Sequence, residues 1–302
     1  MERIARIFKV RASKASELTS INLKSSLSIN PLQNLSYEQL VNEIKGLTEI
    51  ESIPWYPSAF KIIGNKQDLT QNKIFTDGNI YIRNASSLLP VIALDPKGGE
   101  DILDMCAAPG GKSIHIQSVC NNKANLWLND ISHSRTQNML EILENYNVKH
   151  EPATILPGEI LHERIDKKFD KILLDAQCSG EGMLDLSHPQ ALRFWSTEKI
   201  KKFSSLQKRL GASAYEMLKP GGVLVYSTCT YAPEENESII NYLLGKFPDL
   251  TIEDIDIEIP GRMNGLTEWG NRKFRPEVKR AVRVIPSEYM EGFFVCKLRK
   301  AD

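Results

Sequence analysis

Cysteine is scarce in this sequence: five cysteines are spread over 302 residues, and no two of them form a CxxC pair. They are Cys106, Cys120, Cys178, Cys229 and Cys296. An odd number at such wide spacing argues against a disulfide framework, and the lack of close pairs argues against a zinc site. We therefore expect no metal site. An isolated cysteine is most often a small buried hydrophobic side chain, and we interpret Cys120 and Cys296 in this way.

Long hydrophobic runs and an excess of charge of either sign are also absent. The longest apolar stretch, 88–94, contains Pro90 and is far too short to cross a bilayer. Charged residues occur from Glu2 onward, so no secretory signal is visible and a cytoplasmic location is expected. Because 38 basic residues balance 38 acidic ones, any contact with nucleic acid has to come from local basic patches.

Two regions with different apolar patterns make up the chain. Residues 1–72 have a mixed pattern, in which a possible capping box at 36–39 opens a helix with Leu40 and Ile44 on one face. After the turn signal Asp77-Gly78, strand-like runs alternate with helical ones. The expected strands are 102–105, 126–128, 153–156, 171–174 and 223–226. One helix is expected to begin near Lys112, and two more are expected over 134–146 and 200–217. This pattern predicts an α/β domain over 73–302, with a parallel sheet covered by helices on both faces, and a small N-terminal α+β subdomain over 1–72.

Ligands of such sheets bind beyond the carboxyl ends of the strands, so the residues directly after each expected strand are the candidates for a site. The first of these loops is rich in small residues: Cys106, Ala107, Ala108, Pro109, Gly110, Gly111 and Lys112. Small residues let backbone amides approach a ligand closely, and the start of the following helix favours an anionic group. A nucleotide-binding P-loop would need glycine five residues before Gly111, where this chain has Cys106.

The other candidates follow the second, fourth and fifth strands. Asp130 ends the second strand, where a carboxylate can accept both hydroxyls of a ribose; it could also cap the next helix, and the two roles are compatible. Asp175 and Cys178 follow the fourth strand, and Cys229 follows the fifth. A cysteine after a strand is usually buried and inert, but two at the ends of neighbouring strands would converge on one cleft.

With these motifs the sequence resembles the RNA cytosine-carbon-5 methyltransferases that act on ribosomal and transfer RNA, over nearly the whole chain. The matching segments are DMCAAPGGK, DAQCSGEG, YSTCTYAPEENE, 21–24, Pro54-Trp55, 81–87, 189–195 and 292–295. DNA cytosine methyltransferases differ, because they take their nucleophile from the loop after the fourth strand. The resemblance implies a Rossmann-like sheet that binds S-adenosylmethionine, an N-terminal subdomain that docks RNA, and methylation of carbon 5 of a cytosine.

The resemblance also implies roles for single residues. The loop 106–112 would hold the methionine part of the cofactor, and Asp130 its ribose. Asp175 would contact the cofactor's amino group or the target base, and Lys112 would also reach the base. Cys229 would be the nucleophile, and Cys178 would help to release the product.

Two positions depart from the family pattern. Gln177 stands where the family has proline, and Pro157 stands where an aspartate would contact the adenine; Glu159 is the nearest substitute. These departures are the support for a rival interpretation, a non-catalytic RNA-binding factor that keeps the fold. The intact cysteines and cofactor loop argue against it.

The chemistry explains why these residue types are needed. Carbon 5 of cytosine becomes nucleophilic only after a thiolate adds to carbon 6, and a carboxyl group near ring nitrogen 3 stabilises the charge that develops. A thiol with a pKa of about 8.5 is mostly protonated at neutral pH, so the site has to favour the thiolate. The base must also be unstacked to reach the cleft.

Basic residues near both ends are the candidate phosphate contacts. They are Arg3, Arg6, Lys9, Arg11, Lys14, Arg272, Lys273, Arg275, Lys279, Arg280 and Arg283.

Overall fold

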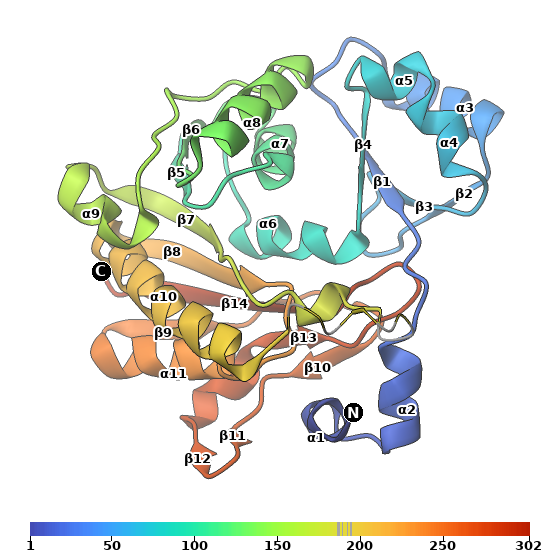
Figure 1. The fold of residues 1–302 in the computed structure, drawn as a ribbon. Coiled ribbons are helices and arrows are strands. Elements are labelled where there is room, and N and C mark those ends of the chain that lie inside the picture. Colours follow the sequence, from blue (N-terminus) through green and yellow to red (C-terminus); the bar gives the residue numbers. More distant parts are fainter. Residues whose placement is uncertain (186–187, 189, 192, 194) are drawn as a thin grey trace.

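The computed structural model describes residues 1–185, 188, 190–191, 193 and 195–302. Part of the expected motif at 189–195, including Pro189, lies outside these residues. The chain forms a four-stranded antiparallel sheet near its N-terminus and a larger sheet that contains most of the other strands. In Figure 1 the small sheet lies at the upper right and the large sheet crosses the centre, with helices on both of its faces.

The small sheet has the strand order β2-β3-β1-β4 and a hydrophobic core of its own. Its elements are β1 (Ser26–Ile29), α3 (Tyr37–Leu47), β2 (Ile50–Ser52), β3 (Ala59–Ile62), α4 (Lys66–Thr70), α5 (Lys73–Thr76) and β4 (Ile80–Arg83). The capping box expected at the start of α3 is confirmed: the Gln39 amide donates to Ser36 Oγ at 3.3 Å, and the Ser36 amide donates to Gln39 Oε1 at 2.9 Å. Leu40 and Ile44 are fully buried on one face of this helix, as expected.

The first two helices lie apart from the small sheet. They are α1 (Glu2–Phe8) and α2 (Ala12–Leu18), at the lower right of Figure 1. Ile7 and Phe8 are buried against Tyr231, and the ring centroids of Phe8 and Tyr231 lie 5.0 Å apart. The start of the chain therefore packs beside the segment that contains Cys229, two residues before Tyr231.

The large sheet is mixed and has the order β10-β13-β14-β8-β7-β5-β6. Its parallel part consists of β5 (Asp101–Asp104), β6 (Asn125–Leu128), β7 (Phe169–Asp175) and β8 (Leu218–Thr228), which confirm four expected strands. The antiparallel part consists of β9 (Leu250–Glu253), β10 (Arg262–Asn264), β13 (Val282–Val284) and β14 (Phe293–Lys300). The expectation of a parallel sheet thus holds for one half only, because the C-terminal strands return beside β8 by antiparallel pairing.

The prediction of a strand at 153–156 is wrong. Only Thr154 pairs there, in an isolated bridge with Asn129. Pro152 and Pro157 bracket the segment, and proline has no amide hydrogen to donate to a sheet. The Thr154 amide still donates to the Leu128 carbonyl at 2.9 Å, which keeps the segment beside β6.

Helices cover both faces of the large sheet, as expected. One face carries α6 (Leu89–Leu94), α7 (Gly111–Cys120) and α8 (His133–Asn145), and the other carries α10 (Thr197–Glu216) and α11 (Glu237–Lys246). Ile200, Leu210 and Ala214 are buried on one side of α10, which confirms the helix expected there. The short elements are η1 (Ala85–Leu88), η2 (Gly158–Ile160), α9 (Leu161–Arg164), η3 (Glu181–Met183), β11 (Glu268–Trp269), β12 (Arg272–Lys273) and η4 (Pro276–Arg280). Within the described ranges, no helix has the length and apolar character needed to cross a membrane.

One residue of the C-terminal basic cluster is part of the core. The side chain of Arg283 is 1% exposed, and its Nε and Nη2 donate to the two carboxylate oxygens of Glu237, each at 2.5 Å. Its Nη1 also donates to the Tyr231 carbonyl at 3.0 Å. The expectation that Arg283 contacts RNA phosphates is therefore wrong, because strand β13 turns this side chain inward against α11.

Candidate active site

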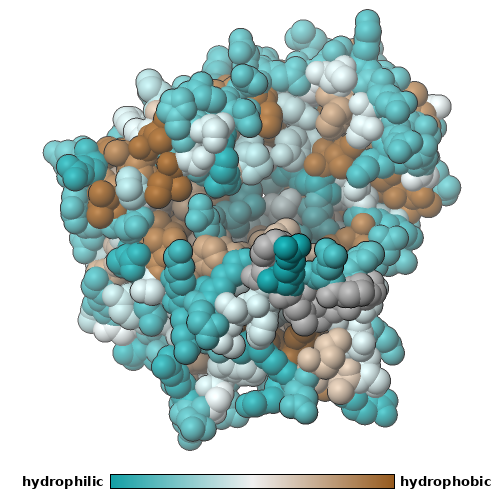
Figure 2. Space-filling view, in the orientation of Figure 1, coloured by the Kyte–Doolittle hydropathy of each residue, from teal (hydrophilic) through white to brown (hydrophobic). Residues whose placement is uncertain are grey.

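The candidate residues converge at the carboxyl ends of β5, β7 and β8, as expected from the sequence. A cavity of about 210 Å³ lies there; its lining includes Asp104, Cys106, Ala108, Pro109, Lys112 and Asp175. In the space-filling view the centre of this face is hollowed, and hydrophilic residues lie at the back of the hollow (Figure 2).

The small residues of the loop 106–112 are required by its close contacts. Gly110 has φ +101°, a conformation that side chains other than glycine rarely adopt. A Cβ atom at Gly111 would lie 2.7 Å from Tyr81 Oη, so a larger residue would displace the tyrosine. Cys106 also lines the cavity, and burial raises the pKa of its thiol well above the usual range. Cys106 therefore lines the cavity as an uncharged thiol and is not suited to act as a nucleophile.

Asp130 is tied to this loop. Its side chain is 2% exposed, Oδ2 accepts from the Ala108 amide at 3.2 Å, and Oδ1 accepts from the Ser132 amide at 3.0 Å. The helix-cap alternative for Asp130 is wrong, because Ser132 caps α8 by accepting from the Arg135 amide at 3.4 Å.

The cavity fits a ligand that carries a cationic amino group. Asp104 is 1% exposed, and its Oδ1 has no hydrogen-bond partner among the described residues, although Ser113 Oγ donates to its Oδ2 at 2.7 Å. Burial raises the pKa of Asp104 to about 7. A buried acceptor without a partner costs free energy unless a ligand or water supplies the donor. The amino group of S-adenosylmethionine is such a donor.

Lys112 and Asp175 form an ion pair at the cavity wall. The Lys112 ammonium lies 2.6 Å from Asp175 Oδ2, and Ser227 Oγ donates to Asp175 Oδ1 at 2.7 Å. Burial lowers the pKa of Lys112, but the charge of Asp175 and its hydrogen bond outweigh burial and raise it. Lys112 therefore keeps its positive charge, and its ammonium is near enough to Cys229 for the two charges to influence each other.

The two cysteines are in contact. Cys178 Sγ lies 3.3 Å from Cys229 Sγ, because β7 and β8 are adjacent parallel strands and each cysteine follows the end of one of them. The hydrogen bond to Cys229, followed by burial, raises the pKa of Cys178 well above the usual range. Either sulfur can be the donor in this contact, so Cys178 can donate a hydrogen bond to a Cys229 thiolate.

Hydrogen bonds with Glu235 and Gln207 anchor the loop that carries Cys178. The Ser179 amide donates to Glu235 Oε2 at 3.0 Å, and Gln207 Nε2 donates to the Gln177 carbonyl at 2.8 Å. The side chain of Gln177 is exposed. The departure from proline at this position therefore leaves the loop anchored, since the anchor is the backbone carbonyl.

At the second departure, Pro157 directly precedes η2, and the carboxylate of Glu159 lies 3.9 Å from Arg209 on α10. Gly158 between them is packed against Leu210, since a Cβ atom there would lie 2.7 Å from Leu210 Cδ2.

Glu291 is a further candidate that sequence reasoning missed. Burial raises its pKa to about 7, while the charge of Lys112 lowers it and that of Asp175 raises it. The Glu291 amide donates to Asn84 Oδ1 at 3.0 Å, and the next amide, Gly292, donates to the Gly182 carbonyl at 3.3 Å. The backbone of Glu291 is thus fixed by these two contacts, and its carboxyl group is close enough to feel the charges of Lys112 and Asp175. The one feature of the sequence that could have indicated Glu291 is its position directly before the 292–295 motif.

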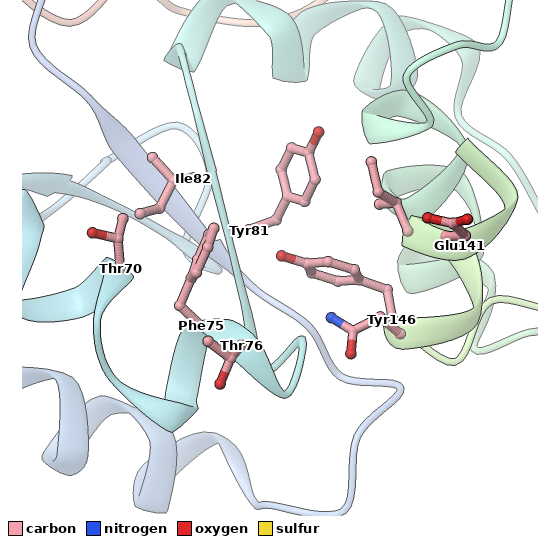
Figure 3. A pocket seen from close by; sticks show the side chains of 9 residues that line it. Thr70, Phe75, Thr76, Tyr81, Ile82, Glu141 and Tyr146 are labelled. Atoms are coloured by element: carbon pink, nitrogen blue, oxygen red, sulfur yellow. The ribbon is translucent and has the colours of Figure 1, made fainter. Parts of the chain in front are cut away.

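A second cavity of about 590 Å³ lies between the small sheet and α8. In Figure 3 the side chain of Tyr146 points toward Phe75 and Tyr81, while the hydroxyl of Tyr81 points away from both. Tyr81 and Ile82 line both cavities, so the second lies directly behind the wall of the first. The Lys112–Asp175 pair lines the smaller cavity but not this one, and we therefore assign the chemistry to the smaller cavity.

Cys120 and Cys296 are buried, as expected. Among the residues that the structure describes, no three His, Cys, Asp or Glu side chains are grouped so that they could hold a metal ion.

Comparison with known proteins gives consistent results. The family model described as 16S rRNA methyltransferase RsmB/F matches residues 91–299. The chain is 37% identical to the tRNA (cytosine(49)-C(5))-methyltransferase of Pyrococcus abyssi, over 92% of this chain and 88% of that protein. It is 35% identical to the ribosomal RNA small subunit methyltransferase F of Serratia proteamaculans, over 92% of this chain but 57% of the relative, so it spans little more than half of that protein.

Solved structures have the same fold. A methyltransferase homolog protein from Pyrococcus horikoshii is 32% identical, with a TM-score of 0.81 over 99% of this chain and 90% of that one. NSun6 from the same organism, 21% identical, has a TM-score of 0.82 over 100% of this chain and 98% of its own, which shows the shared fold alone. The expected Rossmann-like methyltransferase sheet with a separate small N-terminal sheet is confirmed. On this evidence the chain belongs to the RsmB/F family of 16S rRNA methyltransferases.

Proposed function

We propose that this chain methylates carbon 5 of a cytosine in transfer or ribosomal RNA, using S-adenosylmethionine and a covalent bond between Cys229 and the base. The observation that carries the proposal is the 3.3 Å contact between Cys178 and Cys229 beside the Lys112–Asp175 ion pair. Covalent catalysis needs a thiolate, a charge to stabilise the activated base, and a group that assists release, and these residues supply all three.

The cofactor would be held by the loop 106–112 together with Asp130 and Asp175. When bound, S-adenosylmethionine supplies the methyl group. The carboxylates of Asp104 and Asp175, which line the cavity, would accept from its amino group, and Asp130, at the end of β6, would accept from the ribose hydroxyls. Glu159 is less suited to bind the adenine, because its carboxylate faces Arg209.

The chain's own residues would act on the base as follows. The Cys229 sulfur bonds to carbon 6, and the electron pair of the carbon 5–carbon 6 double bond shifts toward ring nitrogen 3. The Lys112 ammonium, held by Asp175, stabilises the negative charge there. After carbon 5 has gained the methyl group, its proton must leave so that the Cys229–carbon 6 bond breaks. Cys178 is the group nearest to Cys229 to assist this step.

The N-terminal region is proposed to dock the RNA. Its boundary, expected at residue 72, stays a prediction; the pairing of β4 with β1 favours a boundary just after Arg83. The packing of α1 against Tyr231 supports a role for the first helices near the target base, since it places them beside the Cys229 segment.

The function is tested by incubating the purified chain with isotopically labelled S-adenosylmethionine and separate transfer and ribosomal RNA fractions. We expect labelled 5-methylcytidine in one fraction by nucleoside mass spectrometry, and bisulfite sequencing then locates the modified cytosine. Binding of the cofactor without labelled 5-methylcytidine in either fraction would favour the non-catalytic alternative.

Asp130→Ala is expected to weaken the binding of S-adenosylmethionine. The substitution removes one or two charge-assisted hydrogen bonds to the ribose, each of which contributes about 1.5–3 kcal/mol. Calorimetry measures the dissociation constant, and Ser132→Ala is the matched control, because it removes the cap of α8 but keeps the carboxylate. An unchanged dissociation constant for Asp130→Ala would exclude this residue from the cofactor site.

A further inference from the structure

A groove of about 530 Å³ lies between α10 and the hairpin formed by β11 and β12. The hairpin projects at the bottom of the molecule in Figure 1, below α10 and α11. One wall of the groove is a stripe along α10 that contains Lys201, Ser204, Ser205 and Lys208. These positions are three, four and seven residues apart, so they lie on one side of the helix.

The opposite wall is one face of the hairpin. Trp269 and Arg272 are directly paired across the two strands, and both line the groove. Residues paired in this way share a face, whereas adjacent residues of a strand point to opposite sides. Arg272 therefore faces the groove, and Lys273, which pairs with Glu268, faces away from it.

The groove carries unbalanced positive charge. Across the described part of the chain, no carboxylate forms an ion pair with Lys201, Lys208 or Arg272. The carboxylate in the lining is Glu234, which Arg3 already neutralises at 2.7 Å and which accepts from Trp269 Nε1 at 2.9 Å. Side chains of Ser238 and Asn271 add polar groups to the same walls. Several cations among hydroxyl and amide groups suit a ligand with repeated negative charges.

The floor of the groove is connected to the catalytic cysteines. Ser204 Oγ donates to the Glu234 carbonyl at 2.7 Å, and the next residue, Glu235, accepts from the Ser179 amide at 3.0 Å. Ser179 directly follows Cys178. A polyanion lying in the groove would thus run alongside the segments that carry both cysteines.

We propose that this groove binds the phosphate backbone of single-stranded RNA next to the target cytosine, with Lys201, Lys208 and Arg272 as the phosphate contacts. The proposal rests on the proposed function, because it makes the groove a part of the substrate site. It divides the C-terminal basic cluster: Arg272 contacts RNA, Lys273 does not, and Arg283 is structural.

The test compares two double variants of the full chain, Lys208→Ala with Arg272→Ala and Lys202→Ala with Lys273→Ala. Both remove two exposed or half-exposed charges from the same helix and hairpin, but only the first removes them from the groove. The probe is a fluorescent polyuridine strand with one central cytidine, and its affinity is measured by anisotropy over a range of potassium chloride concentrations.

Each phosphate contact on a single strand contributes about 0.7 to the slope of log affinity against log salt. The groove variant should therefore have a slope shallower by about 1.4 than the unmodified chain, and the control variant should keep the slope. The proposal that the groove binds RNA would be overturned by equal slopes for all three proteins. It would also be overturned if both double variants reduced the slope equally.

Calorimetry with S-adenosylmethionine shows independently that both variants are folded. A lack of 5-methylcytidine formation by the unmodified chain would count against the proposed function alone, since the slopes still decide whether the groove binds RNA.

Discussion

Replacing Cys229 with alanine should abolish methyl transfer and leave no covalent adduct with RNA, whereas Cys178→Ala should accumulate one. Without the Cys229 sulfur, nothing adds to carbon 6. Without Cys178, addition and methyl transfer can still occur, but release of the product should slow by about 10²–10⁴-fold, the usual contribution of a positioned acid or base. The adduct is measured as an RNA-linked band that survives denaturing electrophoresis.

The structure gives a reason for this division of labour. The hydrogen bond to Cys229 is the largest cause that raises the pKa of Cys178. In the proposed mechanism the Cys229 sulfur loses its negative charge when it bonds to carbon 6, and this cause then weakens. Cys178 then loses its proton more easily, at the stage when a base is required.

Two outcomes would contradict the assignment. An adduct in Cys229→Ala that is absent in Cys178→Ala would reverse the two roles. Full activity in both variants would exclude covalent catalysis by these residues. Cys106→Ala is the matched control: its thiol lines the cofactor cavity, and we expect no effect on adduct formation, because burial keeps that thiol neutral.

Arg283→Ala should destabilise the fold by about 3–5 kcal/mol, because it leaves the buried carboxylate of Glu237 without a positive charge beside it, although the Leu266 amide would still donate to it. The midpoint of urea unfolding measures the loss. Replacing both residues, with Arg283→Met and Glu237→Leu, should recover much of it, since a buried ion pair is often no more stabilising than apolar side chains of similar volume.

Arg280→Ala is the control for this prediction. Arg280 pairs with Asp254 at 2.7 Å on the surface, where solvent screens the charges, so the midpoint should hardly change. If Arg283→Ala behaved like Arg280→Ala, the Arg283–Glu237 pair would not be the link that holds β13 against α11. RNA affinity is a second readout: Arg283 should affect it only through the fold.

Local sequence patterns were sufficient for much of this protein. The capping box at Ser36, the long helix α10 and the four parallel strands follow from periodicity and capping, which depend on residues a few positions apart. The loop 106–112 was recognisable for the same reason, since its small residues directly follow β5 and precede α7. That Cys178 and Cys229 lie close together could also be inferred, because both follow strands of one sheet.

The tertiary structure alone decided the features that depend on distant segments. Glu291 comes within reach of the charges of Lys112 and Asp175 because β14, which begins two residues later, pairs with β8, and no local pattern predicts which strands of a chain become neighbours. Arg283 and Arg272 look alike in the sequence, yet one is buried against Glu237 and the other faces an open groove. Local order along the chain is enough to predict which residues follow each parallel strand. Which charges are paired, buried or free depends on packing between segments far apart in the chain, and no local pattern contains that information.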